Sequence, residues 1–98
     1  MTQANDDLRF AWDPKKDTAN QRKHGVSFAE AQTVFYDESA KLIDDPDHSD
    51  AEDRFIMLGR SYRLHLLIVC HCYREGDDVI RIISARKANK QEQAIYEE

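Results

Sequence analysis

The residues best suited to chemistry in this sequence are its arginines, lysines and histidines. Arg81 lies inside the apolar run of residues 79–83, and Arg86 directly follows the predicted strand of residues 79–85. An arginine among isoleucines needs an anionic partner, because burying an unpaired charge is costly. That partner is either a carboxylate of the same chain or a bound phosphate, whose oxygens a planar guanidinium contacts at two points. If the strand is regular, Ser84 and Arg86 lie on the face opposite Arg81.

Lys23 and His24 form a second candidate group, at the end of a predicted helix and immediately before Gly25. Cationic side chains in a last helical turn complement the negative end of the helix dipole, which is a purely structural role. Histidine also titrates near neutral pH and can therefore transfer protons. From the residues alone, both interpretations stay open.

Two groups of potential metal ligands lack the geometry of a metal site. In residues 70–72, the two-residue period of a strand places Cys70 and Cys72 on the core face and His71 on the other face. No second pair of ligands follows at zinc spacing. The aspartates and histidine of residues 44–50 lack the glycine and final glutamate of a calcium loop. Because the chain also has no glycine-rich phosphate loop, we expect no metal and no other cofactor.

The composition is that of one folded domain, with 98 residues of which 41% are hydrophobic and 34% charged. Two cysteines are too few for a disulfide scaffold, which favours a reducing compartment. Residues 1–8 are polar and acidic, unlike a signal peptide, and the longest apolar run, residues 66–70, is too short to cross a bilayer. We therefore expect a single domain over residues 1–98, located in the cytoplasm and without membrane contact.

Charge is distributed unevenly along the chain, although the net charge is −5. Residues 37–53 carry −7, whereas residues 54–90 carry +5. One interpretation is a solvated acidic loop beside an ordinary surface. The other is a separate basic face that holds phosphates.

The first quarter of the chain predicts a short strand and a helix. Residues 9–12 are a strand candidate, Asp13 followed by Pro14 is typical of a helix start, and Gly25 is typical of a left-handed helix end. The predicted helix, residues 14–24, is polar nearly all round. Such a helix needs contacts from the rest of the protein in order to form.

A second helix is predicted after Ser27, which matches Glu30 in the spacing of a capping box. Apolar residues at three- and four-residue spacing continue this helix to about Tyr36. A third helix, with the same kind of cap, is predicted over residues 89–96.

Four strands are predicted between these helices, over residues 39–43, 54–60, 62–73 and 79–85. Alternation in the third of them predicts a core face made of Leu64, Leu66, Ile68, Cys70 and Cys72. Turns at residues 59–61 and 75–78 keep the connections short, which favours an antiparallel meander. The expected fold class is therefore α+β, a small antiparallel sheet flanked by helices in the order βααββββα.

Several stretches of the sequence resemble the BrnT family of toxins. They are Phe10-x-Trp12-Asp13-Pro14-x-Lys16, Asn20-x-x-Lys23-His24-Gly25-Val26-Ser27-Phe28-x-Glu30-Ala31, Val34-Phe35-x-Asp37, Asp45-Pro46-Asp47-His48, Glu52-x-Arg54, and Arg81-Ile82-Ile83-Ser84-Ala85-Arg86-Lys87-Ala88 followed by Glu92 and Tyr96. The match covers nearly the whole chain and keeps the family's order.

The resemblance implies a single RelE-like domain that acts as the toxin of a bacterial type II toxin–antitoxin pair. It implies arrest of translation through RNA cleavage and neutralisation by a BrnA-like antitoxin that binds DNA. It also implies that the complex represses its own operon. RNA is then the substrate, and operator DNA is contacted only through the antitoxin.

Metal-free RNA cleavage uses the 2′-hydroxyl as nucleophile and needs a base, an acid and cationic groups that stabilise the transition state. On this basis we assign catalysis to four residues and RNA binding to four others. The catalytic candidates are Arg81 and Arg86 as phosphate clamps, His24 as the acid–base group, and Lys23. The RNA-binding candidates are Arg54, Lys16, His71 and Tyr96, with His71 and Glu52 as alternative acid–base groups.

Two other functions are compatible with the sequence. The first is a binding module without catalysis, whose basic face holds the antitoxin or another acidic partner. The second is a structural subunit of a DNA-bound repressor complex. RNA cleavage by the purified protein distinguishes the ribonuclease from both.

Overall fold

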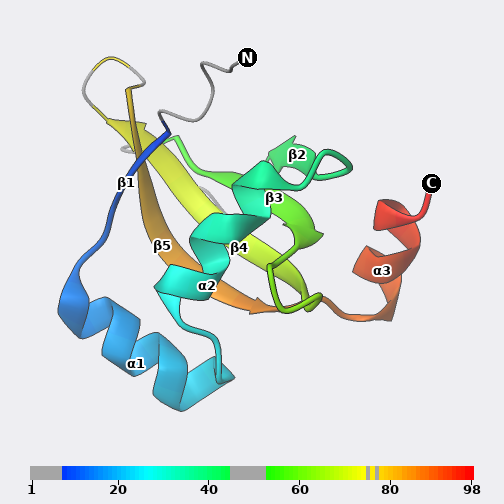
Figure 1. Ribbon diagram of the computed structural model, residues 1–98, viewed down its shortest axis with the longest axis horizontal. Helices are drawn as coiled ribbons and strands as arrows, with labels where there is room; N and C mark the ends of the chain where they lie inside the picture. Colours follow the sequence, from blue (N-terminus) through cyan, green and yellow to red (C-terminus); the bar gives the residue numbers. More distant parts are fainter. Residues whose placement is uncertain (1–7, 45–52, 75, 77) are drawn as a thin grey trace.

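The elements of the chain follow the predicted order. The computed structural model describes residues 8–44, 53–74, 76 and 78–98. Its elements are β1 (Arg9–Ala11), α1 (Pro14–His24), α2 (Phe28–Gln32), the 3-10 helix η2 (Thr33–Tyr36), β2 (Lys41–Asp44), β3 (Phe55–Arg60), β4 (Leu66–Arg74), β5 (Val79–Lys87) and α3 (Lys90–Tyr96). The α+β class and the order βααββββα are confirmed (Figure 1).

The sheet has the strand order β1-β5-β4-β3-β2. Strands β3 to β5 form the predicted antiparallel meander, and β2 pairs antiparallel with β3. β1 lies at the far edge and runs parallel to β5, so the sheet is mixed rather than purely antiparallel. Sequence alone does not predict this pairing, because no hairpin joins β1 to β5. The direction of β1 depends instead on the helices that follow it.

Helix α2 and the 3-10 helix η2 cover one face of the sheet, and α1 lies at its edge beside the end of β5 (Figure 1). The core on that face joins residues from the connection before α2, from α2, η2, β4 and β5, namely Val26, Phe28, Ala31, Val34, Leu67, Val69, Ile82 and Ala85. The predicted core face of β4 is therefore one of two buried faces, since Leu67 and Val69 pack on the helix-covered side. Ile68, Cys70 and Cys72 on the opposite face are buried as well, and a strand buried on both sides gives no clue as to which face the helices cover.

A bulge in β5 changes which residues share a face. Cys70 pairs with Ser84 and His71 with Ile82, so Ile83 has no partner on β4. A bulge of this kind reverses the alternation beyond it.

Paired residues of antiparallel strands point to the same face, and the partners of Arg81, Ser84 and Arg86 are alternate residues of β4. The expectation that Arg81 faces away from Ser84 and Arg86 is thus wrong. All three share the face opposite α2.

The turn between β3 and β4 lies at residues 61–65 rather than at the predicted 59–61. The Ser61 N–H donates to the His65 carbonyl (2.9 Å), and the Leu64 N–H donates to the Ser61 carbonyl (2.8 Å). Gly59 sits inside β3, where an added Cβ would lie 2.9 Å from side-chain carbons of Val34 and Ala40. This glycine therefore marks a close approach of η2 to the sheet and not a turn.

Contacts of Asn20 explain why the polar helix α1 forms. Its cap is as predicted, with the Asp13 side chain accepting from the Lys15 N–H and Gly25 left-handed at φ 71°. The Asn20 amide donates to the Val26 and Ala85 carbonyls (2.8 Å each) and accepts from the Ala85 N–H (3.1 Å). One buried amide thus attaches the helix to the edge of β5.

No helix in the described part of the chain is long and apolar enough to span a membrane.

Candidate active site

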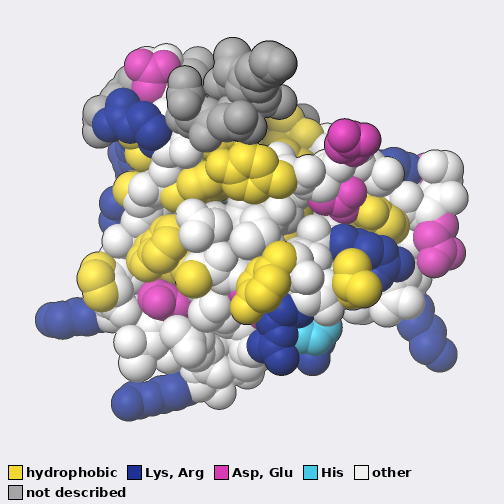
Figure 2. Space-filling view, viewed as in Figure 1, with side chains coloured by type: hydrophobic (Ala, Val, Ile, Leu, Met, Phe, Trp, Pro, Cys, Tyr) yellow, Lys and Arg dark blue, Asp and Glu magenta, His cyan; other side chains and the backbone are white. Residues whose placement is uncertain are grey.

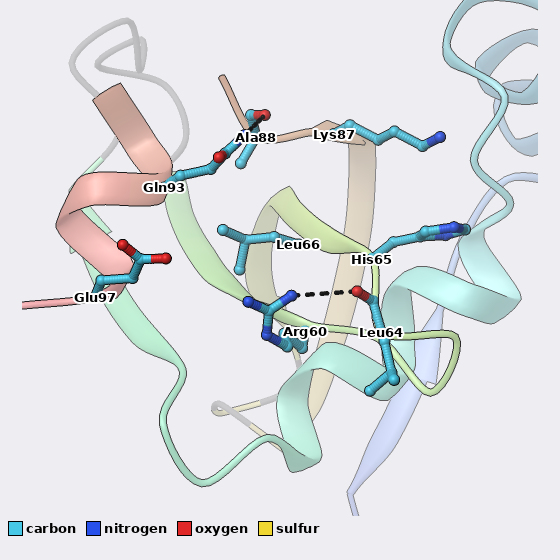
Figure 3. A pocket seen from close by; sticks show the side chains of 8 residues that line it. All are labelled: Arg60, Leu64, His65, Leu66, Lys87, Ala88, Gln93 and Glu97. Carbon is cyan, nitrogen blue, oxygen red and sulfur yellow. Dashed lines mark hydrogen bonds between the residues drawn. The ribbon is translucent and has the colours of Figure 1, made fainter. Parts of the chain in front are cut away.

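A cleft of about 330 Å³ opens between the start of β4, the end of β5 and α3 (Figure 3). We call it the basic cleft. Its lining residues are Arg60, Leu64, His65, Leu66, Lys87, Ala88, Gln93 and Glu97. Figure 3 shows the side chains of His65 and Lys87 extending in the same direction, away from α3. Figure 2 shows lysine and arginine side chains around a histidine at the lower edge of the helix-covered face.

His65 is oriented by a buried carboxylate. Its Nδ1 lies 2.7 Å from Oε2 of Glu30, whose side chain is 5% exposed, whereas the imidazole itself is 34% exposed. An ionised carboxylate only accepts hydrogen bonds, so Nδ1 carries a proton, and Nε2 has a free lone pair whenever the imidazole is neutral. A histidine held in this tautomer by a carboxylate is the arrangement that proton-transferring sites use.

Glu30 stays ionised although it is buried. Burial raises the pKa of its carboxyl, but hydrogen bonds from Ser61 and His65, with the charges of His65 and Arg63, outweigh burial and hold that pKa below its ordinary value. The Ser61 hydroxyl donates to Oε2 at 2.6 Å. Glu30 therefore does not complete the predicted capping box. Only the Ser27 half of that box forms, where the Ser27 hydroxyl accepts from the Glu30 N–H (3.0 Å).

Arg60 is fixed on the other side of the basic cleft. Its Nη1 donates to the Leu64 carbonyl (3.2 Å), and its guanidinium lies over the ring of Tyr96, 5.4 Å from the centroid. Its backbone N–H donates to Oδ2 of Asp37 (2.7 Å), which also accepts from the Tyr96 hydroxyl (2.7 Å). Burial raises the pKa of Asp37, but these bonds and one from the Ser39 N–H hold it below its ordinary value.

Arg86 directly precedes Lys87 and Ala88, which line the basic cleft. Its guanidinium makes two parallel hydrogen bonds to Glu92, at 2.9 and 2.8 Å. These bonds raise the pKa of Arg86 and lower that of Glu92. Glu92 also completes a capping box with Asn89, so the same carboxylate fastens α3 to the end of β5.

Arg81 is half-buried in the middle of β5, on the same face of the sheet as Arg86. Arg60 pairs with Leu66, which places it on this face too. The guanidinium of Arg81 makes no hydrogen bond or ion pair with any residue that the structure describes. Arg54 is half-buried immediately before β3. The pairing of β3, β4 and β5 therefore places Arg60, Arg81 and Arg86 on one side of the sheet.

The candidates on α1 lie on the surface of that helix. Lys16 and Lys23 are exposed, and His24 is half-buried at the last position before Gly25. The end of α1 lies at the same lower edge of the molecule as the end of β5 and the start of β4 (Figure 1). None of the three lines the basic cleft.

His71 and Tyr96 are engaged inside the protein. His71 is fully buried, so the expectation that it contacts RNA is wrong for this conformation. It does lie on the face opposite the cysteines, but that face is the helix-covered one, where its ring packs 4.8 Å from the ring of Phe35. Tyr96 is half-buried and bound through its hydroxyl to Asp37.

Within the described residues, no three potential ligands of the His, Cys, Asp and Glu types gather as a metal site. Glu52 and most of the acidic segment 44–50 lie outside the described residues. The expectation of a reaction without metal therefore stays a prediction.

Comparison with known proteins identifies the family. The model of the ribonuclease toxin BrnT of type II toxin–antitoxin systems matches residues 12–92 of the 98. The chain belongs to the BrnT family. The solved structure of the Brucella abortus ribonuclease toxin BrnT is 27% identical, with a TM-score of 0.63, and the alignment covers 85% of this chain and 99% of that one. The comparison with curated proteins found no match.

The matched region of this BrnT-family chain contains the whole lining of the basic cleft except Gln93 and Glu97. Sequence reasoning missed Arg60, His65, Glu30 and Lys87 as site residues. His65 interrupts an apolar run between Leu64 and Leu66, which is the signal that could have singled it out. Its partner is far away in the sequence, so no local pattern reveals the pair.

Proposed function

We propose that this BrnT-family protein is an endoribonuclease whose reaction takes place in the basic cleft. The observation that carries the proposal is the pair of His65 and Glu30 beside Arg60 and Lys87. It combines an oriented proton acceptor with two cations in one cleft of about 330 Å³. Cleavage of RNA would arrest translation in the cytoplasm. A BrnA-like antitoxin would neutralise the protein, and their complex would repress its own operon.

The reaction needs only the RNA, this chain and water. Nε2 of His65 takes the proton of a 2′-hydroxyl as its oxygen bonds to the adjacent phosphorus, and the ionised Glu30 stabilises the imidazolium that forms. The bond from phosphorus to the 5′-oxygen breaks, and that oxygen takes a proton from water. The hydroxide left behind takes the proton of the imidazolium, which restores His65 as a base. The products are a 2′,3′-cyclic phosphate and a 5′-hydroxyl.

Negative charge increases on the phosphate oxygens in the transition state. Arg60 is preorganised to stabilise it, because its guanidinium is already held by the Leu64 carbonyl and the Tyr96 ring. Lys87 supplies a second charge from the end of β5. Arg81 and Arg86 lie on the same face of the sheet, and we propose that they bind neighbouring phosphates of the RNA strand.

The test compares two histidines. We expect His65→Gln to lower the rate of RNA cleavage by the antitoxin-free protein by about 10²–10⁴-fold, the usual effect of losing an acid–base group. His24→Gln is the matched control and should cleave at nearly the wild-type rate. Both variants are checked by thermal unfolding. Cleavage should persist in chelator and leave a 2′,3′-cyclic end.

Other outcomes lead to different conclusions. Loss of cleavage in His24→Gln alone would move the site to the end of α1. A wild-type protein that binds its antitoxin and cuts no RNA would be a binding module. Inhibition by chelator would contradict the metal-free reaction.

A further inference from the structure

A second cleft adjoins the basic cleft and has no assigned role. It has a volume of about 410 Å³ and is lined by Thr33, Tyr36, Asp37, Arg60, Ser61, Tyr62 and Leu64. We call it the tyrosine cleft. Arg60 and Leu64 line both clefts, so the two are neighbours that share a wall. Figure 3 shows Leu64 beside Arg60 at the rim of the basic cleft.

The tyrosine cleft presents two aromatic rings to solvent. Tyr36 is 51% exposed and Tyr62 is 71% exposed, although large aromatic side chains usually bury most of their surface. The Tyr36 ring is supported by Phe10, with 6.3 Å between the ring centroids. The backbone N–H of Tyr62 donates to the Thr33 hydroxyl (2.9 Å), which in turn donates to the Glu30 carbonyl (2.7 Å). Both tyrosines are thus held from behind while their outer surfaces stay open.

Leu64 forms the shared wall in an unusual conformation. Its φ is 66°, in the left-handed region that non-glycine residues rarely adopt, and its side chain is 73% exposed. Hydrogen bonds of the turn hold it there, because its N–H donates to Ser61 and its carbonyl accepts from Arg60. A strained and exposed apolar residue between two clefts is typical of a functional site, where strain is tolerated.

We propose that the tyrosine cleft binds a nucleobase of single-stranded RNA, stacked on Tyr62 and bordered by Tyr36, while the phosphate beside that base occupies the basic cleft. This inference rests on the proposed function and adds a base-binding subsite to it. Proteins recognise single-stranded RNA by stacking unpaired bases on aromatic rings next to a cationic path for the backbone. Arg60 provides the continuity between the two, since it borders both clefts.

The same residues could instead dock the antitoxin as an apolar patch. The shared arginine favours RNA, because a base and its phosphate are covalently linked and need adjoining aromatic and cationic surfaces. Asp37 does not oppose this arrangement, since its carboxylate is already occupied by Arg60, Ser39 and Tyr96. The choice between RNA and protein is therefore an outcome of the experiment.

The experiment uses a single-stranded RNA that cannot be cleaved, with 2′-O-methyl groups at all positions and 2-aminopurine at each position in turn. We expect binding to quench one position through stacking. Tyr62→Ala should remove that quenching and weaken binding about 5- to 150-fold, whereas Tyr62→Phe should retain both. Leu42→Ala removes another exposed apolar side chain, 54% exposed on β2, and should leave binding unchanged.

Three results would overturn the subsite. In the first, Tyr62→Ala binds the RNA and quenches it as the wild type does. In the second, Tyr62→Ala loses binding of the antitoxin but not of RNA. In the third, the wild-type protein binds the RNA without quenching at any position. Tyr62→Leu is the second variant if Tyr62→Ala fails to fold, and a wild-type quench that persists in it also overturns the proposal. A wild-type protein that binds and quenches this RNA, but cuts no unmodified RNA, would contradict the proposed cleavage and leave the subsite intact.

Discussion

His71 shows how the surroundings of one side chain determine its chemistry. Its ring is enclosed by Phe35, Phe55 and Tyr73, at centroid distances of 4.8, 6.2 and 5.3 Å. Nδ1 lies 3.2 Å from the Val69 carbonyl, and Nε2 lies 3.2 Å from the Tyr73 hydroxyl. Burial lowers the pKa of His71, although the bond to Val69 opposes this effect. The imidazole is therefore neutral in the folded protein at neutral pH and belongs to the core.

This environment makes stability depend on pH. Because the folded-state pKa lies below the ordinary value of 6.5, the unfolded chain takes up a proton first as the pH falls. The contribution of His71 to stability is thus present above about pH 6.5 and decreases below it. We expect His71→Phe to flatten the fall in the free energy of unfolding between about pH 7.5 and about pH 5. Urea unfolding at several pH values measures this, and an unchanged slope would contradict the assignment.

His65 contrasts with His71, although both are histidines of the same hairpin. His65 is partly exposed, bound through Nδ1 to an ionised carboxylate and open to a cleft. His71 has no access to solvent. Residue type alone therefore makes both histidines equal candidates for catalysis. The difference between them is burial, which keeps His71 away from any substrate.

At the scale of elements, α1 replaces a missing strand at the edge of the sheet. β1 pairs with β5 only as far as Arg81. Beyond that point, the side-chain amide of Asn20 both donates to and accepts from the backbone of Ala85, as a neighbouring strand would. A strand edge that is covered by other parts of the protein needs such a partner, because unpaired backbone groups are costly where water cannot reach them.

Removal of this amide should detach α1 from the sheet. Asn20→Ala loses three hydrogen bonds and leaves buried groups of Ala85 and Val26 unsatisfied. We expect a loss of about 2–4 kcal/mol in the free energy of unfolding, measured by urea denaturation. Lys23→Ala, an exposed change on the same helix, should cost less than about 0.5 kcal/mol. Equal stability of the two variants would show that packing, and not the amide, holds α1.

At the scale of the whole molecule, the net charge does not reveal how the charges are distributed over the surface. The chain carries −5, yet the sheet register places Arg60, Arg81 and Arg86 on one face. A face of this kind attracts a polyanion even when the molecule as a whole is acidic, because screening confines each interaction to about 8–10 Å.

RNA binding should therefore weaken steeply as salt increases. Each phosphate contact contributes a slope of about −0.7 to the plot of log affinity against log salt concentration for single strands. We expect Arg81→Ala to reduce the magnitude of the slope by about 0.7, and Lys15→Ala on α1 to leave it unchanged. Binding of a labelled oligonucleotide from about 50 to about 300 mM salt measures both slopes. If the RNA affinity of the wild-type protein did not change with salt, the face that carries Arg60, Arg81 and Arg86 would be excluded as the RNA-binding surface.

The sequence by itself determined the features that depend on neighbouring residues. The caps of α1 and α3, the left-handed Gly25 and the order of elements all follow from residues a few positions apart. Such contacts form within one or two turns of chain, so the same residues produce them in most surroundings. The family resemblance likewise rests on residues read in order along the chain.

Only the tertiary structure decided which residues meet. Glu30 bonds to His65 across the fold instead of closing its own helix cap, since a buried carboxylate is satisfied better by a hydroxyl and an imidazole than by one backbone N–H. One unpaired residue, Ile83, moved Arg81 to the face of Arg86. A contact between distant segments and a bulge both depend on how whole strands pair, and a period of two in the sequence records neither.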